Sequence, residues 1–210
     1  MSVTLPVSVG EALDKLTILD IKCDKIQDER RDDCTLERYT LLKNLQTYVD
    51  RFPWHYKILK EINLTIWNLQ DGFHGKDVNE IKAGQICTEI LKENDRRFRV
   101  KVKLNHLVSS KLREQKGYAK KKAFFYGHLG LGDMFWMCGA VRYLATCYDE
   151  VVIVCKEKYI KNVCNFLKNY NFMMIQNMVG PRFNVGIEKE FVNMVKLNTT
   201  RNARKDIIII

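Results

Sequence analysis

The stretch FFYGHLGLGDMFWMCGAVRYL, residues 124–144, decides how the second half of this chain is interpreted. Three glycines, Gly127, Gly130 and Gly132, separate an aromatic run from an amphipathic segment, and Asp133 follows the last of them. A short apolar run, a glycine-rich turn and a helical pattern are typical of the start of a Rossmann-like unit, in which the turn approaches a phosphate. A plain strand-to-helix turn would use the same residues, so both interpretations stay open at this point.

The spacing of the glycines excludes two common nucleotide motifs. It is G-x-x-G-x-G, whereas the dinucleotide fingerprint is G-x-G-x-x-G and the P-loop is G-x-x-x-x-G-K-[ST]. Asp133 could cap the following helix or act as a general base, and the two roles compete because a capped carboxylate is a weaker base. His128, inside the turn, could contact a substrate or phosphate, or satisfy the backbone.

Beyond the turn, short apolar runs alternate with helical patterns. Strands are expected at 122–127, 150–155, 172–176 and 206–210, and helices at 132–146, 157–169 and 187–197. Nearly continuous apolar strands that alternate with helices are typical of a parallel sheet covered on both faces. We therefore predict a truncated Rossmann-like parallel α/β lobe over residues 121–210.

The first part of the chain, residues 1–120, has the pattern of a helical bundle. Ser8 and Glu11 match a capping box, in which a serine accepts from the backbone at a helix start and a glutamate reaches back. Apolar residues then recur every three or four positions, which predicts helices over about 9–26, 35–50, 53–70 and 77–115. The last helix is expected to bend near Gly84, and residues 3–7 are expected to form an extended edge.

Composition places the chain among globular proteins. It has 210 residues, of which 46% are hydrophobic and 29% charged, unlike a disordered chain. No apolar run is long enough to span a bilayer, and the N-terminus lacks a signal-peptide pattern. Seven cysteines form no C-x-x-C pair, so reduced thiols and a cytoplasmic location are expected. The histidine and cysteine spacings match no zinc site, and neither a metal nor a cofactor is expected.

The net charge of +10 is concentrated in one segment. Residues 92–122 hold twelve Lys and Arg against three acidic residues, so nine of the ten net positive charges lie there. Such a segment can attract phosphorylated ligands or nucleic acid, or it can be a solvated helix face. Nucleic acid is disfavoured as a partner, because its surface would place aromatic residues among the basic ones and only Phe98 is aromatic between 92 and 117.

The quoted stretch and the residues after it resemble the first lobe of GT-B glycosyltransferases, in particular the heptosyltransferase-like group. The matching positions are Gly132-Asp133-Met134-Phe135, Val141-Arg142-Tyr143-Leu144 and Val151-Val152-Ile153-Val154. The resemblance implies sugar transfer from a nucleotide-sugar donor, with Asp133 as the catalytic base. The glycine-rich turn itself makes Gly127, His128, Gly130 and Gly132 the candidates for contact with the substrate phosphates. A glycosyltransferase-related protein of glycan synthesis is therefore the leading hypothesis.

A GT-B enzyme binds its donor mainly with a second Rossmann-like lobe. Of the 210 residues here, 88 follow residue 122, which is most of one lobe. We therefore expect an incomplete lobe, a degenerate lobe, or a site completed by a partner that supplies the second lobe.

The helical part resembles an uncharacterised helical family of bacteria and large DNA viruses, which is often joined to sugar-transfer modules. The motif positions present here are Glu11, Asp14, Lys15, Asn63, Trp67, Asn94, Asp95, Arg97, Lys101, Asn105, Ser110, Glu114, Lys116 and Tyr118. The resemblance brings no established chemistry with it.

One face of the last predicted helix carries a polar stripe formed by Asn94, Arg97, Lys101 and Asn105. Such a stripe could bind a phosphate or carboxylate, so the alternative function is a non-catalytic module that recognises an anionic ligand, a glycan or a protein partner. The stripe could instead form a network between helices. The residues of the first helix that could face it are Glu11, Asp14 and Lys15.

Overall fold

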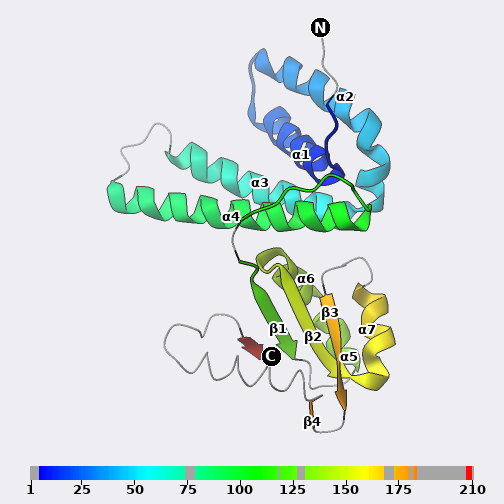
Figure 1. The fold of residues 1–210 in the computed structure, drawn as a ribbon. Coiled ribbons are helices and arrows are strands. Elements are labelled where there is room, and N and C mark those ends of the chain that lie inside the picture. The colour runs from blue at the N-terminus through cyan, green and yellow to red at the C-terminus, as the bar shows by residue number, and fades with distance from the viewer. Residues whose placement is uncertain are drawn as a thin grey trace. The chain divides into compact units, whose positions relative to one another are not determined.

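The structure is a computed structural model. It describes residues 5–73, 79–117, 119–126, 131–167, 173–179, 182–183 and 207–209. The chain divides into two compact units, Met1–Lys116 and Gly117–Ile210, whereas the sequence-based division lies after residue 120. The first unit is helical, and the second combines parallel strands with helices (Figure 1).

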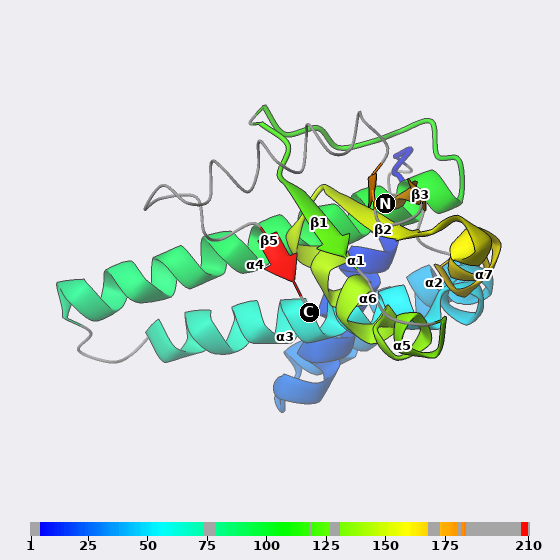
Figure 2. The same ribbon diagram turned by 90° about the horizontal axis from the view of Figure 1, so that it is seen from below.

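The described residues of the helical unit form a bundle, as predicted. Its helices are α1 (Val9–Lys25), α2 (Arg30–Arg51), α3 (Pro53–Phe73) and α4 (Glu80–Leu107). α3 and α4 form a hairpin and lie side by side in both ribbon views (Figure 2). α1 packs against each of the other three helices. Residues 5–7, the described part of the expected extended edge, lie outside any strand.

α1 begins after Ser8 because the Ser8 side chain caps it. Its Oγ accepts a hydrogen bond from the backbone N–H of Glu11 at 3.2 Å, which satisfies one of the unpaired donors of the first turn. The carboxylate of Glu11, expected to complete the capping box, instead accepts from Nζ of Lys101 in α4 at 2.8 Å. The serine half of the capping box is therefore present, and its glutamate links two helices.

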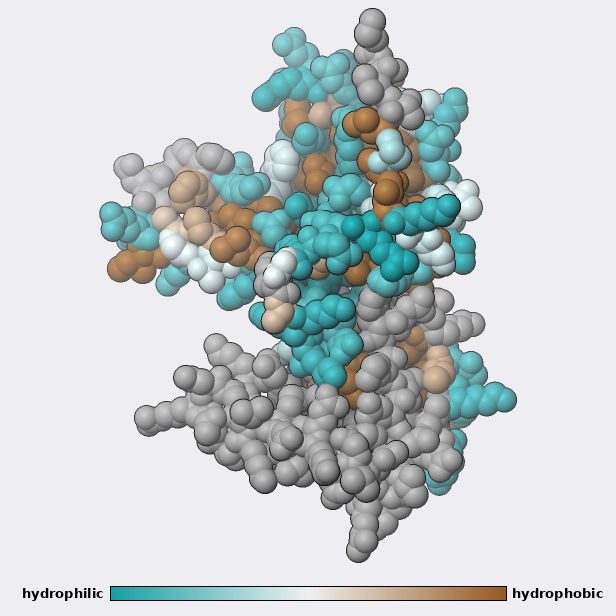
Figure 3. Space-filling view, in the orientation of Figure 1, coloured by the Kyte–Doolittle hydropathy of each residue, from teal (hydrophilic) through white to brown (hydrophobic). Residues whose placement is uncertain are grey.

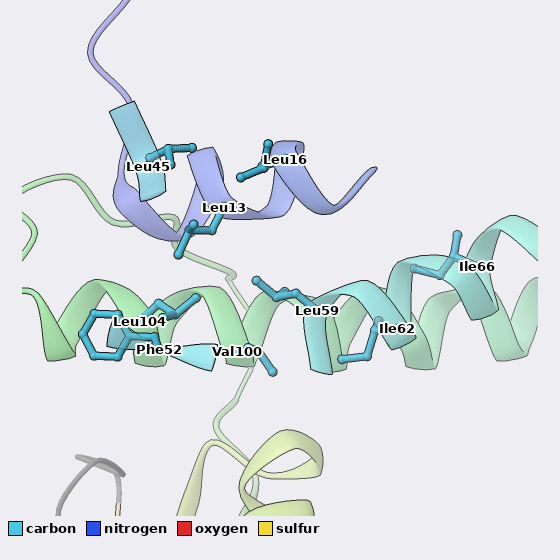
Figure 4. Close-up of a cluster of buried hydrophobic side chains, with 9 residues drawn as sticks. All are labelled: Leu13, Leu16, Leu45, Phe52, Leu59, Ile62, Ile66, Val100 and Leu104. Atoms are coloured by element: carbon cyan, nitrogen blue, oxygen red, sulfur yellow. The ribbon is translucent and has the colours of Figure 1, made fainter. Parts of the chain in front are cut away.

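Apolar side chains from all four helices and the α2–α3 junction form the core of this unit (Figure 4). They are Leu13, Leu16, Leu45, Phe52, Leu59, Ile62, Ile66, Val100 and Leu104. Leu13, Leu59 and Leu104 are completely buried. Because burial of one such side chain stabilises a fold by about 1.5–3 kcal/mol, this cluster holds α1, α3 and α4 together.

The far half of the α3–α4 hairpin lies beyond this core. None of the described residues between 67 and 92 is buried. Ile81 and Leu91 are 77% and 67% exposed, and hydrophobic residues are visible on the surface at that end of the hairpin (Figure 3). The packing that stabilises the unit is therefore concentrated in its near half.

α4 ends at Leu107, although the sequence predicts a helix to about residue 115. Ser109 has a φ of 54°, in the left-handed region that ends helices, and the N–H of Ser110 donates to the carbonyl of Asn105 at 2.8 Å. The chain then turns back along α4 before it leads to the second unit (Figure 1). We call residues 109–116 the strap. α4 runs without interruption through Gly84, where the sequence predicts a bend.

The second unit contains a sheet of mostly parallel strands. The strands are β1 (Lys122–Tyr126), β2 (Glu150–Lys156), β3 (Met173–Val179), β4 (Arg182–Phe183) and β5 (Ile207–Ile209), in the order β4-β3-β2-β1-β5. β1 pairs in parallel with both β2 and β5, and β2 pairs in parallel with β3. The short β4, which the sequence pattern did not predict, pairs antiparallel with β3.

Helices lie between the parallel strands in the chain. They are α5 (Leu131–Trp136), α6 (Cys138–Cys147) and α7 (Ile160–Leu167), with a short 3-10 turn η1 (Glu157–Tyr159) before α7. In β2, Val151, Val152 and Ile153 are each at most 1% exposed. Because successive residues of a strand point to opposite faces, both faces of β2 are covered.

Two helix predictions for this unit have different outcomes. The helix expected over 132–146 is divided at Met137 into α5 and α6. Gly139 is two residues beyond the break, and the low helix propensity of glycine favours an interruption there. The helix expected over 187–197 lies outside the described residues. Across the part of the chain that the structure describes, no helix combines the length and apolarity needed to cross a bilayer.

Candidate functional site

The residues predicted from the glycine-rich stretch are only partly described. Gly127, His128 and Gly130 lie outside the described residues. Gly132 and Asp133 are the second and third residues of α5, and the side chain of Asp133 is also outside what the structure describes. The place of this stretch in the fold therefore comes from the strand before it and the helix after it.

The strand before the stretch, β1, is the point where the strand order reverses. β2 lies on one side of β1 and β5 on the other, and both pair with it in parallel. The carboxyl end of β1 is at Tyr126, and its register places Val154 of β2 and Ile209 of β5 beside that residue. In open α/β sheets ligands bind outside the carboxyl ends of strands at such a switch point. The glycine-rich stretch follows Tyr126 directly in the sequence.

The helix after the stretch is short. α5 has six residues, so it supplies little of the macrodipole that a longer helix would direct at a phosphate. The single helix predicted over 132–146 would direct a stronger dipole at an anion than the six-residue α5 does. Support for a ligand site comes from the strand topology instead.

The polar stripe of the helical unit takes part in a network between helices, which we call the polar seam. Its members are Ser8, Gly10, Glu11, Asp14, Thr17, Asn63, Arg97, Lys101, Asn105 and Glu114. They come from the start of α1, the middle of α3, the second half of α4 and the strap.

Asn105 holds the start of α1 against α4. Its Oδ1 accepts from the backbone N–H of Gly10 at 2.8 Å, and its Nδ2 donates to Oγ of Ser8 at 3.1 Å. The backbones are so close that a Cβ on Gly10 would lie 2.5 Å from the carbonyl oxygen of Lys101. This approach needs a residue without a side chain at position 10.

Lys101 lies between two carboxylates. Its Nζ is 2.8 Å from Glu11 and 2.7 Å from Glu114, and the lysine side chain is only 7% exposed. Burial acts to lower the pKa of Lys101, but its hydrogen bonds to Glu11 and Glu114 outweigh that effect and the pKa is raised. Lys101 is therefore a charged, paired group of the interior.

Asp14 is the buried carboxylate of the seam. Nδ2 of Asn63 donates to it at 2.8 Å, and Nε of Arg97 is 3.9 Å from its other oxygen. Burial raises the pKa of Asp14 despite the opposing effects of the Asn63 hydrogen bond and of the charges on Arg97 and Lys101. Because the folded unit then binds this proton more tightly than the unfolded chain, the contribution of Asp14 to stability falls as pH rises through the raised pKa.

The other predicted members of the stripe have less central positions. Asn94 is half-buried, one turn before Arg97. Nη1 of Arg97 is 3.3 Å from Oδ1 of Asn63, so this guanidinium also contacts α3. Lys15 does not face the stripe, since it forms an exposed ion pair with Glu37 of α2 at 2.6 Å. The described geometry favours the network that the sequence left open as one alternative.

Glu114 and Asn63 are the seam residues that sequence reasoning named in a motif without assigning a role. What could have identified them as site residues is that they occur in the same motif as Lys101 and Asp14. Their contacts could not be found from helix spacing, because Asn63 belongs to another helix and Glu114 was expected to continue α4.

A second buried carboxylate, Asp20, was not predicted as a site residue. Nε of Arg38 is 2.5 Å from one of its oxygens, and the hydroxyl of Tyr56 donates to the other at 2.7 Å. Burial and the neighbouring Asp20 raise the pKa of Tyr56, so the phenol stays protonated. This cluster joins α1, α2 and α3. Among the residues whose structure is described, no group of three or more His, Cys, Asp or Glu could hold a metal ion.

Comparison of the chain with protein-family models, with curated proteins and with solved structures finds no match.

Proposed function

We propose that the second unit is a Rossmann-like lobe that binds a nucleotide-sugar, and that the protein takes part in sugar transfer. The observation that carries the proposal is the position of β1 between β2 and β5, with the glycine-rich stretch directly after its carboxyl end. A nucleotide bound there would lie at the switch point of a parallel sheet, where backbone N–H groups of a glycine-rich turn can approach phosphate oxygens.

Asp133 is the proposed catalytic base, as the resemblance to GT-B glycosyltransferases implies. A base at this place would take the proton of an acceptor hydroxyl as that oxygen attacks the sugar carbon and the nucleoside diphosphate leaves. Gly127, His128, Gly130 and Gly132 would border the phosphates. A second lobe, in a partner or elsewhere in the assembly, would complete the donor site. A cytoplasmic location remains a prediction from composition.

The test is a panel of nucleotide-sugars offered to the purified chain. Binding would be measured by calorimetry and turnover by release of the nucleoside diphosphate, with and without sugar acceptors. Asp133→Asn keeps the shape of the side chain and removes the base, so we expect turnover to fall by roughly 10²–10⁴-fold with donor binding retained.

A matched control is available at the opposite end of the sheet. Glu150 begins β2 and forms a partly exposed pair with Lys122 at 3.4 Å, so Glu150→Gln removes the same charge far from the carboxyl ends. We expect it to leave donor binding and turnover unchanged. If no donor binds saturably and none is turned over, the proposal that this lobe itself binds the donor and supports transfer is wrong.

The alternative, a binding module that uses the Asn94/Arg97/Lys101 face, has less support. Lys101 already has two carboxylate partners, and Asn105 already holds Gly10 and Ser8. An anion at this face would have to displace Glu11 or Glu114. We propose instead that the polar seam fixes the geometry of the helical unit.

A further inference from the structure

The strap is an irregular segment with a defined course. Its first part is folded on itself, since Oγ of Ser110 donates to the carbonyl of Leu112 at 2.9 Å and Nε of Arg113 donates to the carbonyl of Ser110 at 3.0 Å. From there it runs back beside α4 (Figure 1). The last part carries Glu114 and Lys116, whose side chains pair with side chains of α4.

Two ion pairs of opposite sense join the strap to α4. Glu114 accepts from Lys101 at 2.7 Å, and Lys116 donates to Asp95 at 2.6 Å. Asp95 and Lys101 are six residues apart, about 9 Å along a helix, and Glu114 and Lys116 are about 7 Å apart in extended chain. Glu114 and Lys116 therefore each face an opposite charge of α4, and the two segments, which run antiparallel, have approximately the same spacing of these charges.

The strap is held mainly by charge. Its one large aliphatic side chain, Leu112, is 47% exposed. The ammonium of Lys116 also lies 4.9 Å from the centre of the Phe98 ring, a cation–π contact. The Lys116 and Asp95 side chains are 23% and 30% exposed, so water and salt can compete for this pair.

We infer that the strap is an ionic latch that sets the length of the tether between the two units. With the latch closed, the free chain toward β1 begins after Lys116. With it open, residues 114–116 join the free chain, which then begins after Arg113 and gains three residues, up to about 10 Å of extended chain. Opening leaves the core of the helical unit intact, and Lys101 keeps Glu11 as its partner.

Cleavage by an arginine-specific protease after Arg113 measures the open state, because a protease needs an extended segment of chain and the lysine changes below neither create nor remove an arginine site. Asp95→Lys places a like charge beside Lys116 and should raise the cleavage rate on the order of tenfold. Glu114→Gln should raise it similarly. The double variant Asp95→Lys with Lys116→Asp restores opposite charges and should return the rate toward that of the wild type.

The matched control is Glu89→Gln, which removes an exposed ion pair with Lys92 on the same helix and should leave the rate unchanged. A peptide spanning residues 107–117 corrects for protease activity at each salt concentration, and circular dichroism checks that each variant is folded. Wild-type cleavage should rise between 0.05 and 1 M salt. The latch is excluded if folded Asp95→Lys and Glu114→Gln are cut no faster than the wild type, or if the double reversal gives no restoration.

Discussion

Gly10 lies between Ser8 and Glu11 in the capping-box motif of α1, and Gly132 lies in the glycine-rich stretch. The space around these two glycines differs sharply. A Cβ on Gly10 would lie 2.5 Å from the Lys101 carbonyl oxygen and 2.9 Å from Oδ1 of Asn105. A Cβ on Gly132 would meet nothing within 4 Å in the described part of the chain. Packing explains the glycine of the helical unit. Among the described residues, packing gives no reason for a glycine at position 132, and a role in ligand binding there stays a proposal.

The largest expected effect tests the close approach of α1 and α4 at Gly10. Gly10→Ala forces the α1 and α4 backbones apart and should lower the free energy of unfolding of the helical unit by about 3 kcal/mol. Urea denaturation followed by the helical circular dichroism signal measures it.

Gly84→Ala is the control, because Gly84 lies in α4 with open space around it and alanine is the better helix former by up to about 1 kcal/mol. A destabilised Gly84→Ala, or a stable Gly10→Ala, would contradict the proposed close contact.

The next effect concerns the charges of the polar seam. Lys101→Met keeps the length of the side chain but leaves Glu11 and Glu114 without their shared partner. We expect a loss of about 2 kcal/mol, less than for a completely buried pair because both glutamates are half-exposed.

Lys15→Met removes the exposed pair with Glu37 and should cost at most about 0.5 kcal/mol in the same denaturation experiment. Equal losses of unfolding free energy in Lys101→Met and Lys15→Met would mean that the buried pairs of Lys101 stabilise the unit no more than an exposed pair does.

Apart from the controls, the smallest expected effect on stability is at Gly132. Gly132→Ala should change the unfolding free energy of the second unit by no more than about 1 kcal/mol, since its Cβ meets open space and the residue is helical. If the stretch binds phosphates, the same variant should weaken nucleotide-sugar binding, measured by calorimetry. If Gly132→Ala clearly lost stability but bound the nucleotide-sugar unchanged, Gly132 would be a packing glycine like Gly10 and the proposed contrast would be wrong.

The sequence predicted the helices and strands better than it predicted the side-chain contacts between them. Periodicity placed the helices of the first unit and the strands β1, β2 and β3 because each depends on local spacing of apolar residues. The end of α4 was missed, since the left-handed Ser109 and the ion pairs of Glu114 and Lys116 are not visible in local propensity. The partners of Lys101 and Asn105 depend on helices distant in the sequence.

The candidate ligand site was predictable only in outline. The glycine pattern indicated a turn after a strand, but the reversal of strand order at β1 depends on β5, more than 80 residues later in the chain. The division of the expected helix into α5 and α6 was also missed, because both segments are apolar and Met137 carries no stop signal.

The hydrogen bond from Gly10 to Asn105 joins residues 95 positions apart. During synthesis, α1 therefore leaves the ribosome long before the segment that fixes its start. Its first turn, with the Ser8 and Glu11 contacts to α4, cannot be completed until nearly the whole helical unit has emerged. Contacts of such long sequence separation slow folding, because loop closure must precede them. Chains that end before residue 105 would thus lack the contact that fixes the start of α1, and this unit is expected to reach its native state only as a whole.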